Sequence, residues 1–137
     1  LFGDQVGYNF PKITADLDEA ALCLGMERNT ACVFHLMRAM ETVVRTLGGK
    51  LNVTLMNKHQ KSLTWGQVTE QMQTKVDGLP TDQKRPWLDV MASLNSVRLA
   101  WRNDTMHPDR SYSDSDAKLI FENVRSFMIV ASQIMAV

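Results

Sequence analysis

Apolar residues recur at helical spacing along most of the chain. Two long stretches show this most clearly, because their apolar positions follow i, i+3, i+4 and i+7 and therefore line one face of a helix. The first stretch runs from about Asn29 or Thr30 to Gly48-Gly49, and the second follows Ser113. Their apolar stripes are Val33, Leu36, Met37, Met40, Val43, Val44 and Leu47, and Ala117, Ile120, Phe121, Val124, Phe127, Met128, Ala131, Ile134 and Met135.

Three further helices are predicted from shorter apolar patterns and from signals at their ends. One begins at Asn9-Phe10-Pro11 and stops at Gly25, since glycine is common at the C-terminal end of a helix. Another is capped by Thr64 and ends at Asp77-Gly78. A long helix then starts at Thr81 or Asp82 and continues to about Asn103.

The remaining segment, Leu51–Leu63, has no sustained period and is predicted to be a loop. Nothing in the sequence alternates long enough to predict a strand. The short break before Asn29 requires the first two helices to form an antiparallel hairpin. The sequence therefore predicts an all-α, antiparallel and up-and-down bundle of about five helices, as a single domain over residues 1–137.

Composition and charge exclude several classes of protein. Apolar residues make up 45% of the chain and charged residues 22%, which is typical of a folded domain and not of a disordered one. Fifteen basic residues balance fifteen acidic ones, so a broad basic surface for nucleic acid is not expected, although a small local basic site is compatible with this balance. No apolar run reaches the roughly 18 residues of a membrane span. No secretory leader is recognisable either.

The two cysteines, Cys23 and Cys32, fit neither a zinc site nor a disulfide framework. Both lie in apolar helical stretches, so we predict buried free thiols in a reducing compartment, and with that a cytoplasmic protein. The sequence begins at Leu1 and not at a methionine, so a flanking domain outside this sequence is an expected partner.

One polar segment stands between the two last apolar helices, and it contains Arg102, Asn103 and His107, followed by Pro108. Proline disfavours helical geometry in the residue before it, so the chain should leave the helix at His107. An arginine holds two phosphate oxygens with its planar fork, and a histidine exchanges protons near neutral pH. Together these two side chains suit metal-free cleavage of RNA. Arg98, four residues before Arg102, would extend a phosphate-binding strip on the same helix face.

Ordinary structural roles are the alternative for each of these residues. Arg102 and His107 would then stabilise the C-terminal end of a helix, where a cation and a carbonyl cap are both favourable. Asn103 ends helices well, and Arg98 would be a solvated surface arginine.

The run RNDTMHP, within LNSVRLAWRNDTMHPDRSYSDSDAKLIFENVRSFM, resembles the HEPN superfamily (higher eukaryotes and prokaryotes nucleotide-binding). The earlier stretch NTACVFHLMRAMETVVRTLG resembles the second helix of bacterial HEPN-like proteins. The resemblance implies a metal-independent endoribonuclease from a toxin–antitoxin or defence system. Its active site would form where two protomers meet, with Arg102 and His107 as catalytic residues. Asn103, which also matches the family's motif, would orient the histidine or contact the ribose of the substrate, while the substrate-binding role of Arg98 rests on its spacing from Arg102.

Two further functions stay open beside the ribonuclease. One is a non-catalytic HEPN-like module that dimerises and binds a nucleotide, RNA or a partner protein, and the other is a scaffold for flanking domains. Toxins of this superfamily that pair with a nucleotidyltransferase antitoxin often carry a tyrosine two residues after the histidine. Here Asp109 occupies that position and the nearest tyrosine is Tyr112, which argues against this form of regulation.

The other notable residues favour structural roles. Arg38 and Glu41 lie one turn apart and are predicted to form an ordinary surface ion pair, with a polar pair facing the cleft as the alternative. His35 is predicted to be partly buried and hydrogen-bonded. The nine methionines are expected to fill the core. The three tryptophans, Trp65, Trp87 and Trp101, are expected in the core or at a dimer face, with stacking on bases as the alternative. No glycine-rich phosphate loop or metal-ligand cluster is present in the sequence, so neither a nucleotide cofactor nor a metal is predicted.

Overall fold

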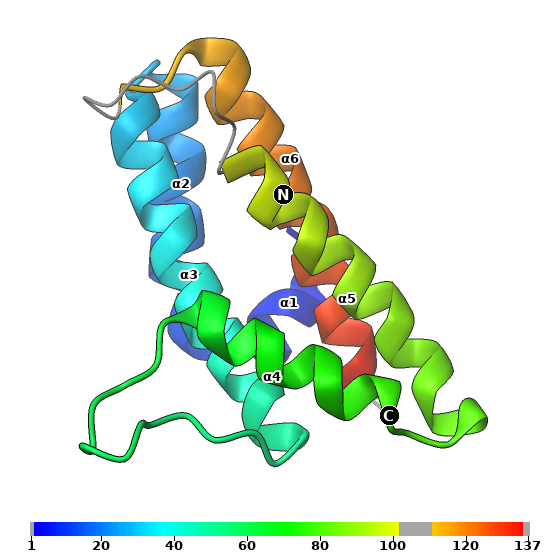
Figure 1. Ribbon diagram of the computed structural model, residues 1–137. Coiled ribbons are helices and arrows are strands. Elements are labelled where there is room, and N and C mark those ends of the chain that lie inside the picture. The colour runs from blue at the N-terminus through cyan, green and yellow to red at the C-terminus, as the bar shows by residue number, and fades with distance from the viewer. Residues whose placement is uncertain (1, 102–110, 136–137) are drawn as a thin grey trace.

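The computed structural model of the chain describes residues 2–101 and 111–135. Over these residues it is all-helical, as predicted, and an isolated bridge between Met56 and Ser62 is the one extended pairing (Figure 1). The elements, in chain order, are α1 (Asp4–Asn9), the 3₁₀-helix η1 (Pro11–Ile13), α2 (Thr14–Gly25), α3 (Asn29–Lys50), α4 (Trp65–Asp77), α5 (Thr81–Trp101) and α6 (Asp114–Met135).

The described residues contain six α-helices, whereas about five were predicted. The additional helix, α1, has six residues and buries only Val6, so it is too short to produce a helical repeat in the sequence. The prediction also placed the start of the next helix too early. Pro11 begins the short η1, and α2 itself starts at Thr14.

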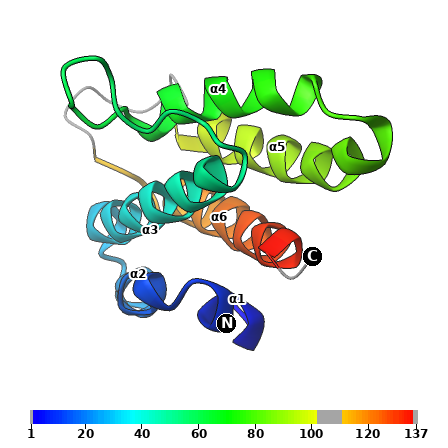
Figure 2. The ribbon, with the colours of Figure 1, turned by 90° about the horizontal axis from the view of Figure 1, so that it is seen from below.

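Four long helices form two antiparallel hairpins, α2–α3 and α5–α6, that pack side by side. The chain reverses between α2 and α3 over a tight turn in which Glu27 has a positive φ of 58°. Helices α3 and α6 lie together at the centre and run in the same direction (Figures 1 and 2). Helix α4 departs from the predicted up-and-down order, because it crosses one end of the bundle between α3 and α5 (Figure 1).

The predicted apolar stripes form the core. Leu36, Met40, Phe127 and Met128 are completely buried where α3 and α6 meet the other helices, and each contributes about 1.5–3 kcal/mol relative to full exposure. The buried cluster includes residues from α1 to α6. Met40, Met72, Met91 and Met128 fill space in the core, as predicted. The same prediction is wrong for Met26 and Met56, which are exposed.

Gly48 has a different role from the helix stop that the sequence suggested. Helix α3 continues to Lys50, and Gly48 lies where α3 contacts α4. A Cβ atom at this position would lie 2.8 Å from Cγ1 of Val68, which is closer than packed carbon atoms allow. Glycine at this position therefore permits the close approach of α4 to α3.

Two helix starts agree with the sequence. The Thr64 hydroxyl accepts a hydrogen bond from the Gln67 backbone N–H, and the Gln67 side chain accepts one from the Thr64 N–H. Ser113 and Asp116 make the same reciprocal pair at the start of α6. These capping boxes satisfy backbone donors that a helix end otherwise leaves unpaired.

Candidate functional site

The predicted motif belongs to the connection between α5 and α6, the two helices of the second hairpin. Helix α5 ends at Trp101 and α6 begins at Asp114. Arg102, Asn103 and His107 lie outside the described residues. Helix α5, which precedes the motif in the chain, contributes residues to two hollows.

Arg98 is the predicted site residue that the structure describes. Its side chain is partly buried on α5, where it lines a groove of about 530 Å³ between α4 and α5. The facing wall consists of Thr69, Glu70, Gln73 and Thr74 from α4. The groove thus offers one cation opposite hydroxyl, amide and carboxylate groups, which suits a ligand that carries both an anion and hydrogen-bond donors.

A second hollow, which we call the tryptophan pocket, lies at the end of the same two helices. It has a volume of about 440 Å³. Its wall includes Trp65 and Gly66 from the start of α4, Trp101 from the end of α5, and Glu41 from α3. Because Trp101 directly precedes Arg102 in the chain, this pocket lies one residue from the predicted motif.

The aromatic wall of the tryptophan pocket consists of two indole rings in a tilted contact. The ring centroids of Trp65 and Trp101 lie 5.5 Å apart, with an angle of 32° between the planes. Trp65 is 7% exposed, whereas Trp101 is partly exposed. The prediction that the tryptophans pack in the core is confirmed for Trp65 and Trp87. Trp101 is thus an accessible indole with a buried indole behind it.

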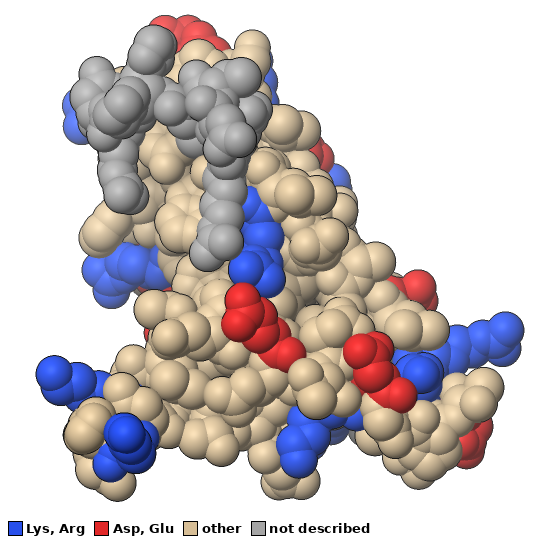
Figure 3. All heavy atoms as spheres, viewed as in Figure 1, with Lys and Arg blue, Asp and Glu red and all other residues tan. Residues whose placement is uncertain are grey.

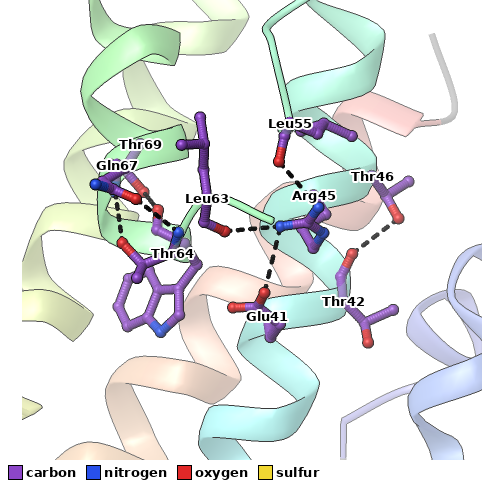
Figure 4. A network of polar contacts seen from close by, with 10 residues as sticks. Glu41, Thr42, Arg45, Thr46, Leu55, Leu63, Thr64, Gln67 and Thr69 are labelled. Carbon is purple, nitrogen blue, oxygen red and sulfur yellow. Dashed lines mark hydrogen bonds and ion pairs between the residues drawn. The ribbon is translucent and has the colours of Figure 1, made fainter. Parts of the chain in front are cut away.

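Arg45 contacts two residues of the pocket's other wall, Leu63 and Glu41, and Figure 4 shows both contacts. Its guanidinium donates hydrogen bonds to the carbonyl oxygens of Leu63 (2.9 Å) and Leu55 (3.2 Å), at the two ends of the small hairpin in the loop. It also contacts Oε1 of Glu41 at 3.4 Å. The sequence analysis missed this residue. The available signal was the Glu41–Arg45 spacing of four residues, which favours an ion pair on a helix.

The predicted pairing of Arg38 with Glu41 is wrong, because each has a different partner. Glu41 contacts Arg45, and Arg38 Nε lies 3.4 Å from Oδ2 of Asp16 on α2. The Arg38 guanidinium also lies over the ring of Phe34, 5.8 Å from its centroid. The two residues therefore belong to separate clusters, because Arg38 pairs with α2 and Glu41 pairs within α3.

The prediction for His35 is confirmed, since it is partly buried and its Nδ1 lies 2.8 Å from Oδ1 of Asp16. Asp16 thus joins α2 to both His35 and Arg38 on α3. We call these three residues the Asp16 cluster. They hold two helices together.

The predicted buried free thiols are confirmed as well, because Cys23 and Cys32 are both buried and unbridged. Burial raises the pKa of the Cys32 thiol from 9.0 to about 11, and the nearby Cys23 adds to this rise. A thiol that stays protonated is a poor nucleophile, so Cys32 is suited to packing and not to covalent chemistry.

The charge distribution agrees with the neutral composition. On the face seen in Figure 3, basic and acidic side chains alternate instead of forming one broad basic area. Within residues 2–101 and 111–135, no three histidine, cysteine or acidic side chains gather in a way that could hold a metal ion. None of the helices over these same residues has the length and apolar character needed to cross a bilayer.

Comparisons with family models, with curated proteins and with solved structures find no match for this chain. The resemblance to the HEPN superfamily therefore rests on the motif and on the helix stretch quoted above.

Proposed function

We propose that the chain is a metal-independent endoribonuclease of the HEPN type, from a toxin or defence system, that acts as a homodimer. The observation that carries the proposal is the position of the Arg102–His107 motif. It lies between two long antiparallel helices, and α5 leads to it from the groove and the tryptophan pocket. A ribonuclease needs an open polar surface for its substrate, and the two hollows, which include residues of α5, support the proposal.

The proposed chemistry is transfer of the phosphodiester to the neighbouring 2′-hydroxyl. One His107 removes the proton from the ribose 2′-oxygen, which attacks phosphorus. Arg102 stabilises the added negative charge on the phosphate oxygens. The bond from phosphorus to the 5′-oxygen breaks, and the partner's His107 protonates that oxygen. The products are a 2′,3′-cyclic phosphate and a 5′-hydroxyl, and Asn103 positions the ribose or the imidazole.

Arg98 and the groove around it would bind the RNA on one side of the cleaved bond. Its partly buried guanidinium is suited to one phosphate, while Gln73 and Thr74 opposite can contact sugar or base. A single partly buried arginine is compatible with a chain of zero net charge, because the affinity for RNA would not then depend on a broad basic surface.

The second candidate is a non-catalytic module that dimerises and binds a nucleotide, RNA or a partner protein through the same groove. The mixed charge of the face in Figure 3 favours this alternative, because it would give weak attraction to long RNA. Both candidates use the same groove and differ in whether Arg102 and His107 perform chemistry.

The deciding experiment is cleavage of a mixed-sequence RNA in EDTA, with the native chain compared to Arg102→Ala and His107→Ala. We expect the native protein to leave 2′,3′-cyclic phosphate ends. The cleavage rate of each folded variant should be at least about 100-fold lower. Equal rates for all three proteins would contradict it. Binding of RNA without cleavage by any of them would favour the module.

A mixing experiment tests the shared active site. Arg102→Ala and His107→Ala chains are each expected to be inactive alone. The two variants are dissociated, mixed and allowed to form dimers again. If each active site contains residues from two protomers, the heterodimers should show cleavage activity that neither variant has alone. Analytical ultracentrifugation of the native chain is the control, and a monomer at the assay concentration would contradict the composite site.

A further inference from the structure

We infer that the tryptophan pocket binds a guanine base of the RNA, with Glu41 as the group that selects guanine. This inference rests on the proposed function, because it assigns the base recognition of the same site. The pocket's volume of about 440 Å³ falls in the range of small-molecule sites and exceeds what one nucleobase requires.

The aromatic pair provides the surface on which a base stacks. Trp101 is partly exposed at the pocket wall, and the buried Trp65 supports it at a centroid distance of 5.5 Å. Stacking on an indole is favourable for every base, because each base has a π-face. The tryptophan pair therefore explains binding, and the choice among bases must come from the polar wall.

Glu41 is a carboxylate whose geometry is fixed but whose hydrogen-bonding capacity is incomplete. Its Oε1 contacts Arg45, and Arg45 is held in turn by two backbone carbonyls. Among the described residues, no donor contacts the other oxygen, Oε2. The side chain is 41% exposed at the pocket, so an arriving ligand can reach it. Figure 4 shows its carboxylate on the side of the helix that faces Leu63 and Thr64.

A carboxylate accepts hydrogen bonds and donates none, and this limits which base it can select. Guanine presents two adjacent donors, N1–H and the 2-amino group, which match the spacing of carboxylate oxygens. Adenine, cytosine and uracil each place an acceptor beside their donor on that edge, so one of their contacts with Glu41 would be repulsive.

The position of the pocket connects base recognition to the proposed chemistry. Trp101 directly precedes Arg102 in the chain, so the pocket and the motif are neighbours in the sequence. The enzyme would therefore cut beside guanosine.

Calorimetric titration with each of the four nucleoside 3′-monophosphates tests the base pocket without requiring cleavage. We expect guanosine 3′-monophosphate to bind at least tenfold more tightly than the other three. Glu41→Gln should abolish this preference, because an amide presents one donor and one acceptor. Glu122→Gln is the matched control, since Glu122 is also a helical glutamate paired with an arginine, at 3.7 Å on α6, and it should bind like the native chain.

A second variant keeps the test decisive if Glu41→Gln alters the loop. Trp101→Leu should weaken all four nucleotides by at least fivefold, and Trp101→Phe should restore most of the affinity while the melting temperature stays constant. Equal affinity of the native chain for all four nucleotides would overturn the inference.

Cleavage mapping then separates the failure of this inference from failure of the proposed function. Cuts that require His107 but fall beside all four bases would contradict guanine selection and leave the ribonuclease in place. Guanine binding that depends on Glu41, without any cleavage, would support the pocket and contradict the ribonuclease.

Discussion

Helix α3 takes part in two clusters of charged side chains, and these clusters differ in what lies beside them. In the Asp16 cluster, the carboxylate of α2 is 18% exposed and contacts both His35 and Arg38 between two packed helices. In the other cluster, Glu41 is 41% exposed beside Arg45 and lines the tryptophan pocket. The first carboxylate has its hydrogen-bonding capacity occupied within the protein. The second has an oxygen, Oε2, that no donor contacts within residues 2–101 and 111–135.

The comparison shows that a carboxylate–arginine pair indicates function only together with a cavity. Both clusters place an acid within 3.4 Å of an arginine nitrogen. Of the two acids, Glu41 lines the tryptophan pocket, whereas Asp16 lines neither this pocket nor the groove beside Arg98. Substitutions in the Asp16 cluster should therefore change stability alone, while those near Glu41 should change stability and ligand binding together.

The largest effect is expected for Arg45→Ala. This change removes two hydrogen bonds to backbone carbonyls and the contact with Glu41, so unfolding free energy should fall by about 3 kcal/mol. Chemical denaturation measures it. Arg38→Ala is the matched control in the Asp16 cluster, and because Arg38 is 61% exposed it should cost less than about 1 kcal/mol. Equal losses for the two variants would contradict the difference between the clusters.

Gly48→Ala should have the next largest effect. The added methyl group would lie 2.8 Å from Val68 Cγ1 and separate α4 from α3, at a cost of about 2 kcal/mol. Gly49→Ala is a neighbouring control with nothing within 4 Å of the new Cβ, and it should stabilise the helix by roughly 0.5–1 kcal/mol. Thermal unfolding of both variants checks the prediction. Stabilisation by Gly48→Ala would show that the contact is not tight.

The buried thiol of Cys32, where α3 packs against α2, should make the stability of the protein depend on pH. Because folding raises its pKa from 9.0 to about 11, the thiol stabilises the protein fully below pH 9, and this contribution is lost as the pH rises toward 11. The stability difference between the native chain and Cys32→Ala should therefore shrink by about 1 kcal/mol from pH 8 to pH 10. Cys23→Ala is the parallel variant. A difference that stays constant across this range would contradict the burial argument.

The smallest effect is expected for Asp16→Asn, which keeps an acceptor for His35 but removes the charge beside Arg38. The loss of stability should be about 0.5 kcal/mol, since this cluster is only partly buried. Binding of guanosine 3′-monophosphate should not change. A tenfold loss of that binding would show that the two clusters act as one site, which would contradict the expectation that the Asp16 cluster affects stability alone.

The sequence predicted the elements whose signals are local and repeated. The stripes of α3 and α6 are long enough to define their buried faces, and Thr64 and Ser113 define helix starts through short-range hydrogen bonds. Helix α1 was missed because six residues do not establish a period.

The described part of the site was harder to predict, because its contacts join residues that are distant in sequence. Arg45 binds carbonyls in a loop that has no periodic pattern. The Trp65–Trp101 pair joins the start of α4 to the end of α5. Glu41 could be assigned a partner from helix spacing at either Arg38 or Arg45, and only the fold selects Arg45.

The central claim is that the Glu41 side of α3 serves RNA chemistry. The most direct test is one set of reactions in EDTA, in which the native chain, Glu41→Gln, Asp16→Asn and His107→Ala act on the same end-labelled RNA of mixed sequence. The account predicts the same cuts beside guanosine for the native chain and Asp16→Asn, cuts spread over all bases for Glu41→Gln, and none for His107→Ala. Cleavage by His107→Ala at the native rate and positions would contradict it.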